Sequence, residues 1–366
     1  MNIFQAYFSF LEGNSYEIGR RQGEEIKKNP YAMNVLVSSE SIDESKFKNM
    51  KKLIEQYCPG LNEELEGFAD ALGVKSSYLN FYDEVWLQSG GCSLGAILPS
   101  KTIDNKTYVL RNYDLSPAIS DMRLCTTKVQ GKYSHTGFSV SYFGRSEGLN
   151  EKGFCVAFAS CGIPVGKHIG MKKPVTKGLQ FMVIVRALLE NCKNVEEGIR
   201  CLEDMPIGAN MNLLLADANG EAALYETYDG AKAVRKTDRD YLIATNHALF
   251  PEVESLELGR FVHSQLRFNI LEHKFSASGK RSVGELQKLI STEFPEGLSV
   301  HNYQENFGTV HSVLFNLTDC QLEFSFGSPV QNKIYKIGVG DSFLKTSLPV
   351  KFQNREYGTD FWRVSK

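Results

Sequence analysis

The sequence places a cysteine directly after a glycine, at Gly91-Cys92-Ser93, well inside the chain. A cysteine in this position can attack the carbonyl of the preceding residue, cut its own chain and become a new N-terminus. The freed α-amine, with an ordinary pKa of about 7.7–8.0, would then be a base beside a thiol whose ordinary pKa is about 8.5. We therefore predict a self-cleavage junction at Gly91-Cys92, with Cys92 as the nucleophile of the mature chain.

Two charged residues are predicted to lie beside this cysteine. A strand that begins at Cys92, a turn at Asp104-Asn105-Lys106 and a return strand together indicate an antiparallel hairpin. The hairpin would bring back Arg111, whose fixed positive charge lowers the pKa of a nearby thiol, and Asp114, which can accept hydrogen bonds from the amine. The same two residues are also compatible with a simple ion pair at the end of a hairpin.

The pattern of apolar residues changes at Cys92. Residues 15–90 have helical periodicity, whereas the following residues read as short strands that are interrupted by a few helices. The predicted helices span residues 15–26, 41–56, 60–72, 178–190, 195–202, 261–275 and 283–291. Strands, then helices, then strands again predict a layered α+β or α/β fold with mostly antiparallel hairpins.

Composition excludes several classes of protein. The chain has 366 residues, 42% hydrophobic and 23% charged, with a formal net charge of −2 and no basic run, so it has a sizeable core and nucleic acid is not an expected partner. No apolar run reaches the roughly 18 residues of a membrane span, and no secretory signal is visible. We expect a cytoplasmic protein without a membrane partner.

The cysteines give no sign of a metal site or of a disulfide framework. All eight lack paired C-x-x-C spacing, and several stand in apolar runs as small core residues. Glycine-rich stretches such as Gly338-Val339-Gly340 lack the strand–loop–helix frame of a phosphate site. We expect neither a metal nor an organic cofactor.

Short patches of sequence stand in a characteristic order along nearly the whole chain. They are Ile18-Gly19-Arg20-Arg21-Gln22-Gly23-Glu24, Gly91-Cys92, Arg111-Asn112-Tyr113-Asp114, Gly148-Leu149-Asn150-Glu151-Lys152-Gly153, Ala244-Thr245-Asn246-His247 and Arg260-Phe261-Val262. Together they resemble the penicillin acyltransferase-like group of cysteine N-terminal nucleophile hydrolases and, more distantly, the choloylglycine hydrolases. The resemblance implies an α+β fold, a four-layer αββα sandwich. It further implies a helical propeptide of residues 1–91, retained after cleavage as a partner of a hydrolase chain of residues 92–366.

The resemblance also implies roles for residues far along the chain. Asn246 would donate its side-chain amide to the oxyanion, Arg260 would complete the polar network around the nucleophile, and His247 would support Asn246. Asn150 and Ser160 would lie on the oxyanion or substrate side. Ser160 stands where choloylglycine hydrolases have a second asparagine, so bile-salt specificity is not expected.

The expected activity is cleavage of a linear, non-peptide amide of a small N-acyl compound through a thioester on Cys92. Hydrolysis and acyl transfer share this acyl-enzyme, and the sequence leaves both open, as it leaves open a homo-oligomer. The aromatic residues Tyr142, Phe143 and Phe158 would suit an apolar acyl group, although aromatic residues in strands are more often part of a core.

A serine hydrolase is one alternative. Gly144-Arg145-Ser146-Glu147-Gly148 matches the Gly-x-Ser-x-Gly elbow, and Asp217 and His247 follow in the order that α/β-hydrolases use. An elbow needs a helix directly after the serine, whereas the residues that follow Gly148 read as a turn and a strand.

Two further alternatives remain. A papain-like pair of Cys92 with His247 or His311 would also activate a thiol, but the local cysteine signature of that family is absent. A binding protein that kept the fold without the chemistry would be favoured if Cys92, Asp114 or Asn246 were missing, and all three are present.

Overall fold

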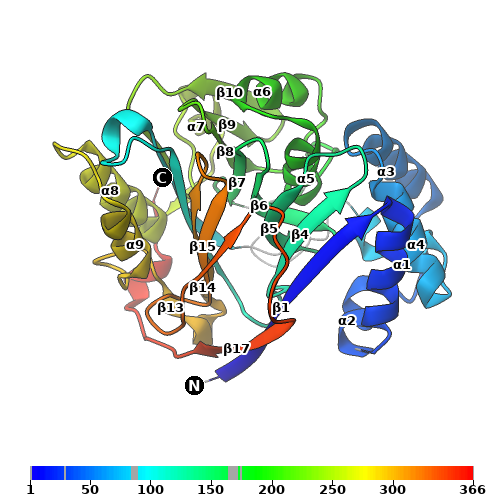
Figure 1. Cartoon of the computed structure of the whole chain (residues 1–366). Helices are drawn as coiled ribbons and strands as arrows, with labels where there is room; N and C mark the ends of the chain where they lie inside the picture. The colour runs from blue at the N-terminus through cyan, green and yellow to red at the C-terminus, as the bar shows by residue number, and fades with distance from the viewer. Residues whose placement is uncertain (1, 29, 84–89, 164–171, 174, 366) are drawn as a thin grey trace.

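Two β-sheets packed face to face form the centre of the computed structural model, which describes residues 2–28, 30–83, 90–163, 172–173 and 175–365. Helices cover the outer face of each sheet, as Figure 1 shows. Helices α8 (Val262–Ser276) and α9 (Val283–Ser291) lie on one side, and α5 (Phe181–Asn191) and α6 (Val195–Glu203) lie on the other. The predicted α+β, four-layer αββα sandwich is confirmed.

The seven-stranded sheet carries the predicted hairpin. Its order is β11-β2-β3-β14-β15-β16, with the short β13 paired to β14, and every pairing is antiparallel. The strands are β2 (Gly91–Ile97), β3 (Tyr108–Leu115), β11 (Tyr241–Ala244), β13 (His301–Asn302), β14 (Phe307–Asn316), β15 (Gln321–Phe326) and β16 (Tyr335–Gly338). Because β3 lies between β2 and β14, side chains from all three strands meet near the start of β2.

The nine-stranded sheet has the order β10-β9-β8-β7-β6-β5-β4-β1-β17. Its strands are β1 (Asn2–Gly13), β4 (Arg123–Val129), β5 (His135–Val140), β6 (Gly144–Asn150), β7 (Phe154–Ser160), β8 (Met211–Asp217), β9 (Ala222–Tyr228), β10 (Ala231–Lys236) and β17 (Ser347–Phe352). All of its pairings are antiparallel except that of β1 with β4, which is parallel. Figure 1 also shows the small helix α7 (Pro251–Glu254), and β12 (Arg260–Phe261) pairs with β18 (Val364–Ser365).

Three apolar clusters hold the layers together. One lies between the sheets and contains Cys92, Tyr113 and Phe138, among others. A second packs α8 and α9 against the seven-stranded sheet, and a third packs α5 and the N-terminal helices against the nine-stranded sheet. The alternating faces of the strands explain this division, because successive side chains point to opposite sides of a sheet.

The first 91 residues, called the leader below, are not entirely helical as predicted. Four helices occur, α1 (Ser15–Ile26), α2 (Pro30–Leu36), α3 (Glu44–Tyr57) and α4 (Leu61–Leu72), but residues 2–13 form β1. This strand lies between β4 and β17, with a partner on each side. Its alternation of exposed and buried residues is weak, so the sequence pattern gave little sign of a strand.

Helices α1 and α4 cross at a very short distance. A Cβ atom added to Gly19 would lie 1.8 Å from the backbone oxygen of Glu64, so only glycine fits at this crossing. The close packing brings Gln22 of α1 beside Glu64 of α4, where the amide donates to the carboxylate at 2.7 Å. The leader is therefore a packed unit of its own.

A network of buried hydrogen bonds and ion pairs connects this unit to the rest of the molecule. Arg186 of α5 donates to Glu64 at 2.5 Å and to Glu190 at 2.8 Å, and Arg123 of β4 donates to Gln22 at 2.8 Å. All five side chains are at least nine-tenths buried. Removing one partner of a buried ion pair lowers the free energy of unfolding far more than removing one partner of a surface pair, because the remaining charge is buried without compensation.

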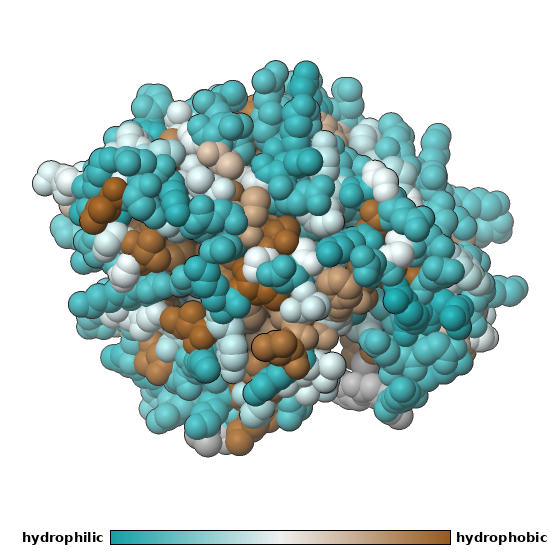
Figure 2. Space-filling model, viewed as in Figure 1, coloured by the Kyte–Doolittle hydropathy of each residue, from teal (hydrophilic) through white to brown (hydrophobic). Residues whose placement is uncertain are grey.

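Figure 2 shows a mostly polar face in which apolar residues gather over the central strands, between the helices at either side. No helix in the described ranges of the chain is long and apolar enough to cross a membrane.

We predict that Glu64→Ala lowers the free energy of unfolding by about 3–5 kcal/mol, because Arg186 loses one of its two buried carboxylate partners and Gln22 loses its acceptor. Urea unfolding followed by circular dichroism measures the change. Glu63→Ala, at an exposed position of the same helix, is the matched control and should cost far less. If Glu64→Ala lowered the free energy of unfolding by less than about 1 kcal/mol, the buried polar network would not be what stabilises the position of the leader.

Candidate active site

Cys92 lies on β2 with its side chain fully buried between the sheets. It pairs with Tyr113 of β3, and Arg111 lies two residues before Tyr113 on the same face of that strand. The guanidinium of Arg111 donates to Cys92 Sγ at 3.2 Å. The predicted hairpin thus brings Arg111 to the thiol.

Burial, rather than Arg111, dominates the ionisation of the thiol. Loss of hydration raises the pKa of Cys92 to about 11, although the charge of Arg111 opposes this. In the intact chain the thiol is therefore protonated near neutral pH. A base is needed to remove its proton.

A second buried pair holds Arg111 in place. Its guanidinium lies 2.6 Å from a carboxylate oxygen of Glu147 on β6 and donates to the carbonyl of Ser146 at 2.8 Å. The other oxygen of Glu147 bonds to Nε2 of His311 at 2.6 Å, and the His311 ring stacks on Phe138 with 3.7 Å between centroids. Both sheets contribute to this line of contacts.

The charges within the line compensate one another. Burial alone would raise the pKa of Glu147, but Arg111 and His311 outweigh it and hold that pKa below its ordinary value. Burial lowers the pKa of His311 despite the opposing effect of Glu147, so its imidazole is neutral near pH 7. The positive charge of Arg111 beside the thiol is thus balanced by one carboxylate.

Asn246 holds the backbone nitrogen of the nucleophile. Cys92 N–H donates to Asn246 Oδ1 at 2.8 Å, and Asn246 Nδ2 donates to the backbone and hydroxyl oxygens of Ser160, each at 3.0 Å. Ser160 in turn donates its hydroxyl to the carbonyl of Gly90 at 3.1 Å. The structure thus brings Asn246 and Ser160 together at the predicted junction.

Arg267 of α8 holds the carbonyl side of Cys92. Its guanidinium donates to the Cys92 carbonyl oxygen, to Ser93 Oγ at 3.1 Å and to Asn246 Oδ1 at 3.0 Å. It also lies 3.7 Å from Asp114. The nucleophile is therefore held at its thiol, its nitrogen and its oxygen by three different side chains.

Arg260, which the sequence comparison placed in this network, lies elsewhere. Its guanidinium forms ion pairs with Glu254 and Glu257, each at 2.9 Å. Arg260 forms part of β12, ahead of α8, whereas Arg267 lies in the second turn of that helix and faces the seven-stranded sheet. The arginine that contacts Cys92 is therefore Arg267, and the expectation for Arg260 is corrected.

Asp114 lies opposite Gly91 across the β2–β3 pairing, and its Oδ1 accepts from Thr309 Oγ1 of β14 at 2.7 Å. Its Oδ2 is buried, lies 3.7 Å from the Arg267 guanidinium and accepts no hydrogen bond in the described part of the chain. Burial raises the pKa of this carboxyl. The Oδ2 atom can therefore still accept a hydrogen bond from a nearby donor.

Only glycine fits at position 91, directly before Cys92, because the Phe307 ring occupies the space of a side chain. A Cβ atom at Gly91 would lie 2.3 Å from the Phe307 ring, closer than real Cβ contacts allow. The peptide that would be cut is thus held between Phe307 on one side and the Cys92 contacts on the other.

The other candidate residues lie apart from this network. Asn150 accepts from Lys152 and Phe154 nitrogens at the turn between β6 and β7 and donates to Leu189 and Cys192 carbonyls. His247 bonds through Nδ1 to the Ser264 hydroxyl at 2.9 Å. The Ser264 hydroxyl also donates to Thr245 Oγ1 at 3.0 Å, and the Ser264 carbonyl accepts from Thr245 Oγ1 at 3.0 Å. The structure places neither Asn150 nor His247 on Cys92.

The serine elbow is not formed. Ser146 lies within β6 and is fully buried, and the residues after it continue as strand and then turn into β7. Asp217 caps the start of α6 by accepting from Val195 N at 3.0 Å. A nucleophile elbow needs an exposed serine between a strand and a helix, so this alternative fails.

The family of the chain follows from comparison with known families. The model of the acyl-coenzyme A:6-aminopenicillanic acid acyl-transferase family matches residues 101–331, which is more than half of the chain. The chain belongs to this family. The resemblance noted in the sequence is thereby confirmed. The matched range contains Arg111, Asp114 and Asn246 and begins after Cys92.

Three solved structures are similar to this acyltransferase-family chain. A mutant conjugated bile acid hydrolase from Clostridium perfringens has 14% identity over 73% of this chain and 99% of its own, with a TM-score of 0.44. Penicillin V acylase from Agrobacterium tumefaciens has 16% identity over 68% and 86%, with a TM-score of 0.43. The N-acylethanolamine-hydrolyzing acid amidase ortholog of Caenorhabditis elegans has 15% identity over 62% and 93%, with a TM-score of 0.43. A comparison with curated protein sequences finds no match.

Three residues of the site were missed by sequence reasoning. Glu147 stands inside the patch that was weighed as an elbow, Arg267 follows the patch that pointed to Arg260, and Thr309 is an ordinary strand residue. The sequence offered one indication for Arg267: it lies four residues after His263 in a predicted helix, so the two polar side chains share one helix face, and in the structure they form a hydrogen bond. Among the described residues, no cluster of three or more His, Cys, Asp or Glu side chains is suited to hold a metal ion.

We predict that Gly91→Ala slows the expected self-cleavage by about tenfold or more, because a contact with Phe307 displaces the peptide that would be cut. The double variant Gly91→Ala with Phe307→Leu should recover part of the rate, since leucine lacks the ring atoms that clash. Gel electrophoresis over time measures the fraction cut. Gly358→Ala, with open space around its Cβ position, is the control. A double variant no faster than Gly91→Ala would contradict the steric explanation.

We predict that Glu147→Gln lowers kcat about tenfold while KM changes little, because Arg111 loses the charge that fixes it beside the thiol. Steady-state kinetics on any amide substrate of the mature protein provide the test. Glu221→Gln, at a half-exposed glutamate that pairs with Lys236 on the same sheet, is the matched control. Equal kcat in both variants would show that Glu147 does not position Arg111.

Proposed function

We propose that the chain is a self-processing cysteine amidohydrolase or acyltransferase that cuts the linear amide bond of a small N-acyl compound. One observation carries the proposal: buried side chains hold the thiol, the nitrogen and the carbonyl oxygen of Cys92 separately. Such preorganisation is costly to build from buried charges and is typical of reacting centres. Membership of the acyltransferase family supports the same reaction class.

The first reaction would be the cut at Gly91-Cys92. The Cys92 sulfur adds to the Gly91 carbonyl carbon, the bond from that carbon to the Cys92 nitrogen breaks, and the nitrogen takes up the thiol proton. Water then hydrolyses the thioester, which leaves a carboxylate on Gly91 and a free amine and thiol on Cys92. Phe307 and Ser160, which fix Gly91 and Gly90, would hold the peptide for this step.

The freed amine would supply the base that the buried thiol lacks. Its ordinary pKa is about 7.7–8.0, so a useful fraction is unprotonated near neutral pH. Asn246 Oδ1, which already accepts from the Cys92 nitrogen, and Asp114 Oδ2, which accepts no hydrogen bond within the described residues, would orient the amine. Arg111 would stabilise the thiolate that forms.

Substrate cleavage would follow the same path. The amine takes the thiol proton, the sulfur bonds to the acyl carbon, the amide C–N bond breaks, and the proton passes to the departing amine. Water then releases the free acid, or a second amine accepts the acyl group. The amide of Asn246 would exchange one of its hydrogen bonds to Ser160 for one to the oxyanion, a contribution whose loss typically costs about 100–1,000-fold in rate.

The leader would stay bound after the cut as a partner chain. Its strand β1 pairs on both sides within the nine-stranded sheet, and Glu64 and Gln22 bond to residues of the later chain. The product would therefore be a heterodimer held without a covalent link.

We expect the purified protein to contain two chains, residues 1–91 and 92–366, which separate only when denatured. Intact mass under denaturing and native conditions measures this. Cys92→Ala should remain one chain and should lack activity against a panel of N-acyl amines and N-acyl amino acids, whereas Ser146→Ala should cleave itself. An active wild-type protein with a single uncut mass would refute self-processing. Full amidase activity in Cys92→Ala would refute the cysteine mechanism.

A further inference from the structure

A cavity of about 1040 Å³ opens at the end of the sandwich where β2 begins and β3 ends. Tyr113 and Leu115, which flank Asp114 on β3, form part of its wall. Tyr113 is the cross-strand partner of Cys92, and its ring lies over the Arg111 guanidinium at 4.7 Å. Tyr113 is therefore shared by the cavity wall and the surroundings of the buried Cys92 thiol, and the volume of the cavity suits a ligand of drug-like size.

One wall of the cavity is strained. Met122, Ser141 and Tyr142 all line it, and they have φ angles of 46°, 53° and 68°, in the left-handed region that non-glycine residues rarely adopt. Residues held in this way tend to occur at ligand sites, because neighbouring groups must force the conformation. Three such residues around one cavity therefore indicate that the shape of the cavity serves to bind a ligand.

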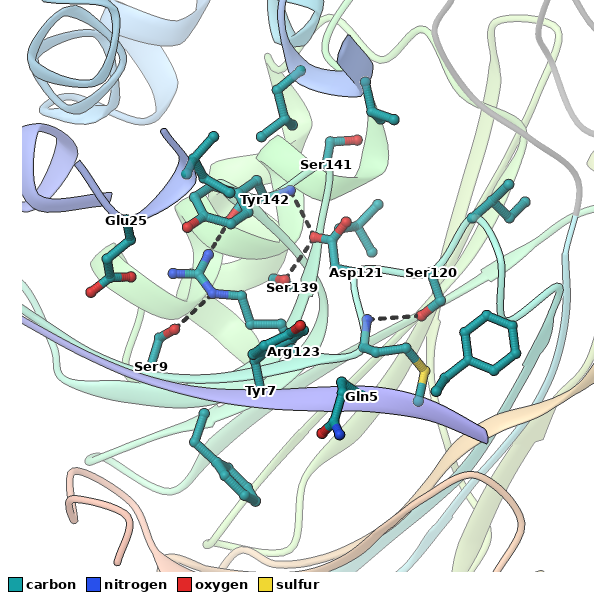
Figure 3. Close-up of a pocket in the computed structure, with 18 of the residues that line it drawn as sticks. Gln5, Tyr7, Ser9, Glu25, Ser120, Asp121, Arg123, Ser139, Ser141 and Tyr142 are labelled. Atoms are coloured by element: carbon teal, nitrogen blue, oxygen red, sulfur yellow. Dashed lines mark hydrogen bonds between the residues drawn. The ribbon is translucent and has the colours of Figure 1, made fainter. Parts of the chain in front are cut away.

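Asp121 and Arg123 force that conformation, as the close-up in Figure 3 shows. Asp121 accepts from Ser139 Oγ and from Tyr142 N–H, each at 2.7 Å. Arg123 donates to the Tyr142 carbonyl at 2.9 Å and stacks on the Tyr142 ring at 3.9 Å. Both charged groups are thus engaged with the wall itself.

These contacts favour an uncharged ligand. The further donors of Arg123 go to Ser9 at 2.8 Å and to Gln22 at 2.8 Å, so its charge is spread over protein groups. Glu25 and Lys28, the other charged residues of the lining, are exposed to solvent. Much of the remaining wall is apolar, with Ile26, Leu36, Leu115, Met122 and Phe181 among its residues.

The leader supplies a large part of the lining, with residues of β1, α1 and α2. Strand β1 lies beside β4, where Tyr7 pairs with Arg123, and Figure 3 shows Gln5, Tyr7, Ser9 and Glu25 around Arg123. Arg123 also donates to Ser9 and Gln22, so hydrogen bonds join the leader to the strained wall. The cavity exists only while the leader is in place.

We propose that this cavity receives the acyl group of the amide substrate, an uncharged and largely apolar group, and that leader side chains determine which acyl group is accepted. The inference rests on the proposed function. It assigns a specificity role to residues that precede the cut, and it makes Asp121 and Arg123 positioning residues of the acyl site.

The test uses N-acyl aminomethylcoumarins, in which the leaving amine is constant and only the length of the linear acyl chain varies. Val35→Trp narrows the leader wall and should raise KM at least about tenfold for the longest chain that the wild type accepts, with little change for the shortest. Leu36→Ala widens it and should shift the preference to longer chains. Val234→Trp, at a valine of equal exposure on β10 (39% against 38% for Val35), is the matched control.

The outcomes separate the two proposals. If the wild type cuts itself but releases no coumarin from any chain length, and no N-acyl compound in the wider panel reacts, the proposed function fails. If the wild type is active and both leader variants keep its chain-length profile, the acyl-site assignment fails while the function stands. Self-cleavage, read by intact mass, should be normal in all three variants and shows that each is folded.

Discussion

The antiparallel pairing of β3 with β2 on one side and β14 on the other fixes the groups that these three strands contribute to the candidate site. It sets Cys92 opposite Tyr113 and Gly91 opposite Asp114, and it sets Thr309 opposite Asp114 from the other edge. A shift of one residue would turn Arg111 and Tyr113 to the other face of the sheet. The apolar cores on both faces prevent that shift, so the packing of the sandwich is also what aligns the chemistry.

Burial then determines how the site is charged. A fully buried thiol beside two guanidinium groups still has a raised pKa, because the loss of water outweighs the nearby positive charges. The positive charges are in turn tolerated because Glu147 and Asp114 lie within reach of Arg111 and Arg267. The charges of the site thus compensate one another, and the α-amine that the proposed cleavage creates would serve as the base for the thiol.

Much of this arrangement could be read from the sequence, and the part that could not has physical reasons. The hairpin that brings Arg111 and Asp114 to Cys92 follows from local turn residues and strand periodicity, and Asn246 followed from a recognisable patch. Arg267 and Glu147 reach the site from another layer through tertiary packing, which leaves no local mark in the sequence. Strand β1 has too weak an alternation to be recognised and is defined by its neighbours β4 and β17.

The position of β1 also limits how the mature protein can be made. A gene that starts at codon 92 would encode a chain whose nine-stranded sheet has a gap between β4 and β17. Arg123 would lose Ser9 and Gln22, and Arg186 would lose Glu64. The proposed cut at Gly91-Cys92 would therefore come after the full-length chain has folded. The two resulting chains would have to be produced from one gene, because β4 and β17 each lose a neighbour when β1 is absent.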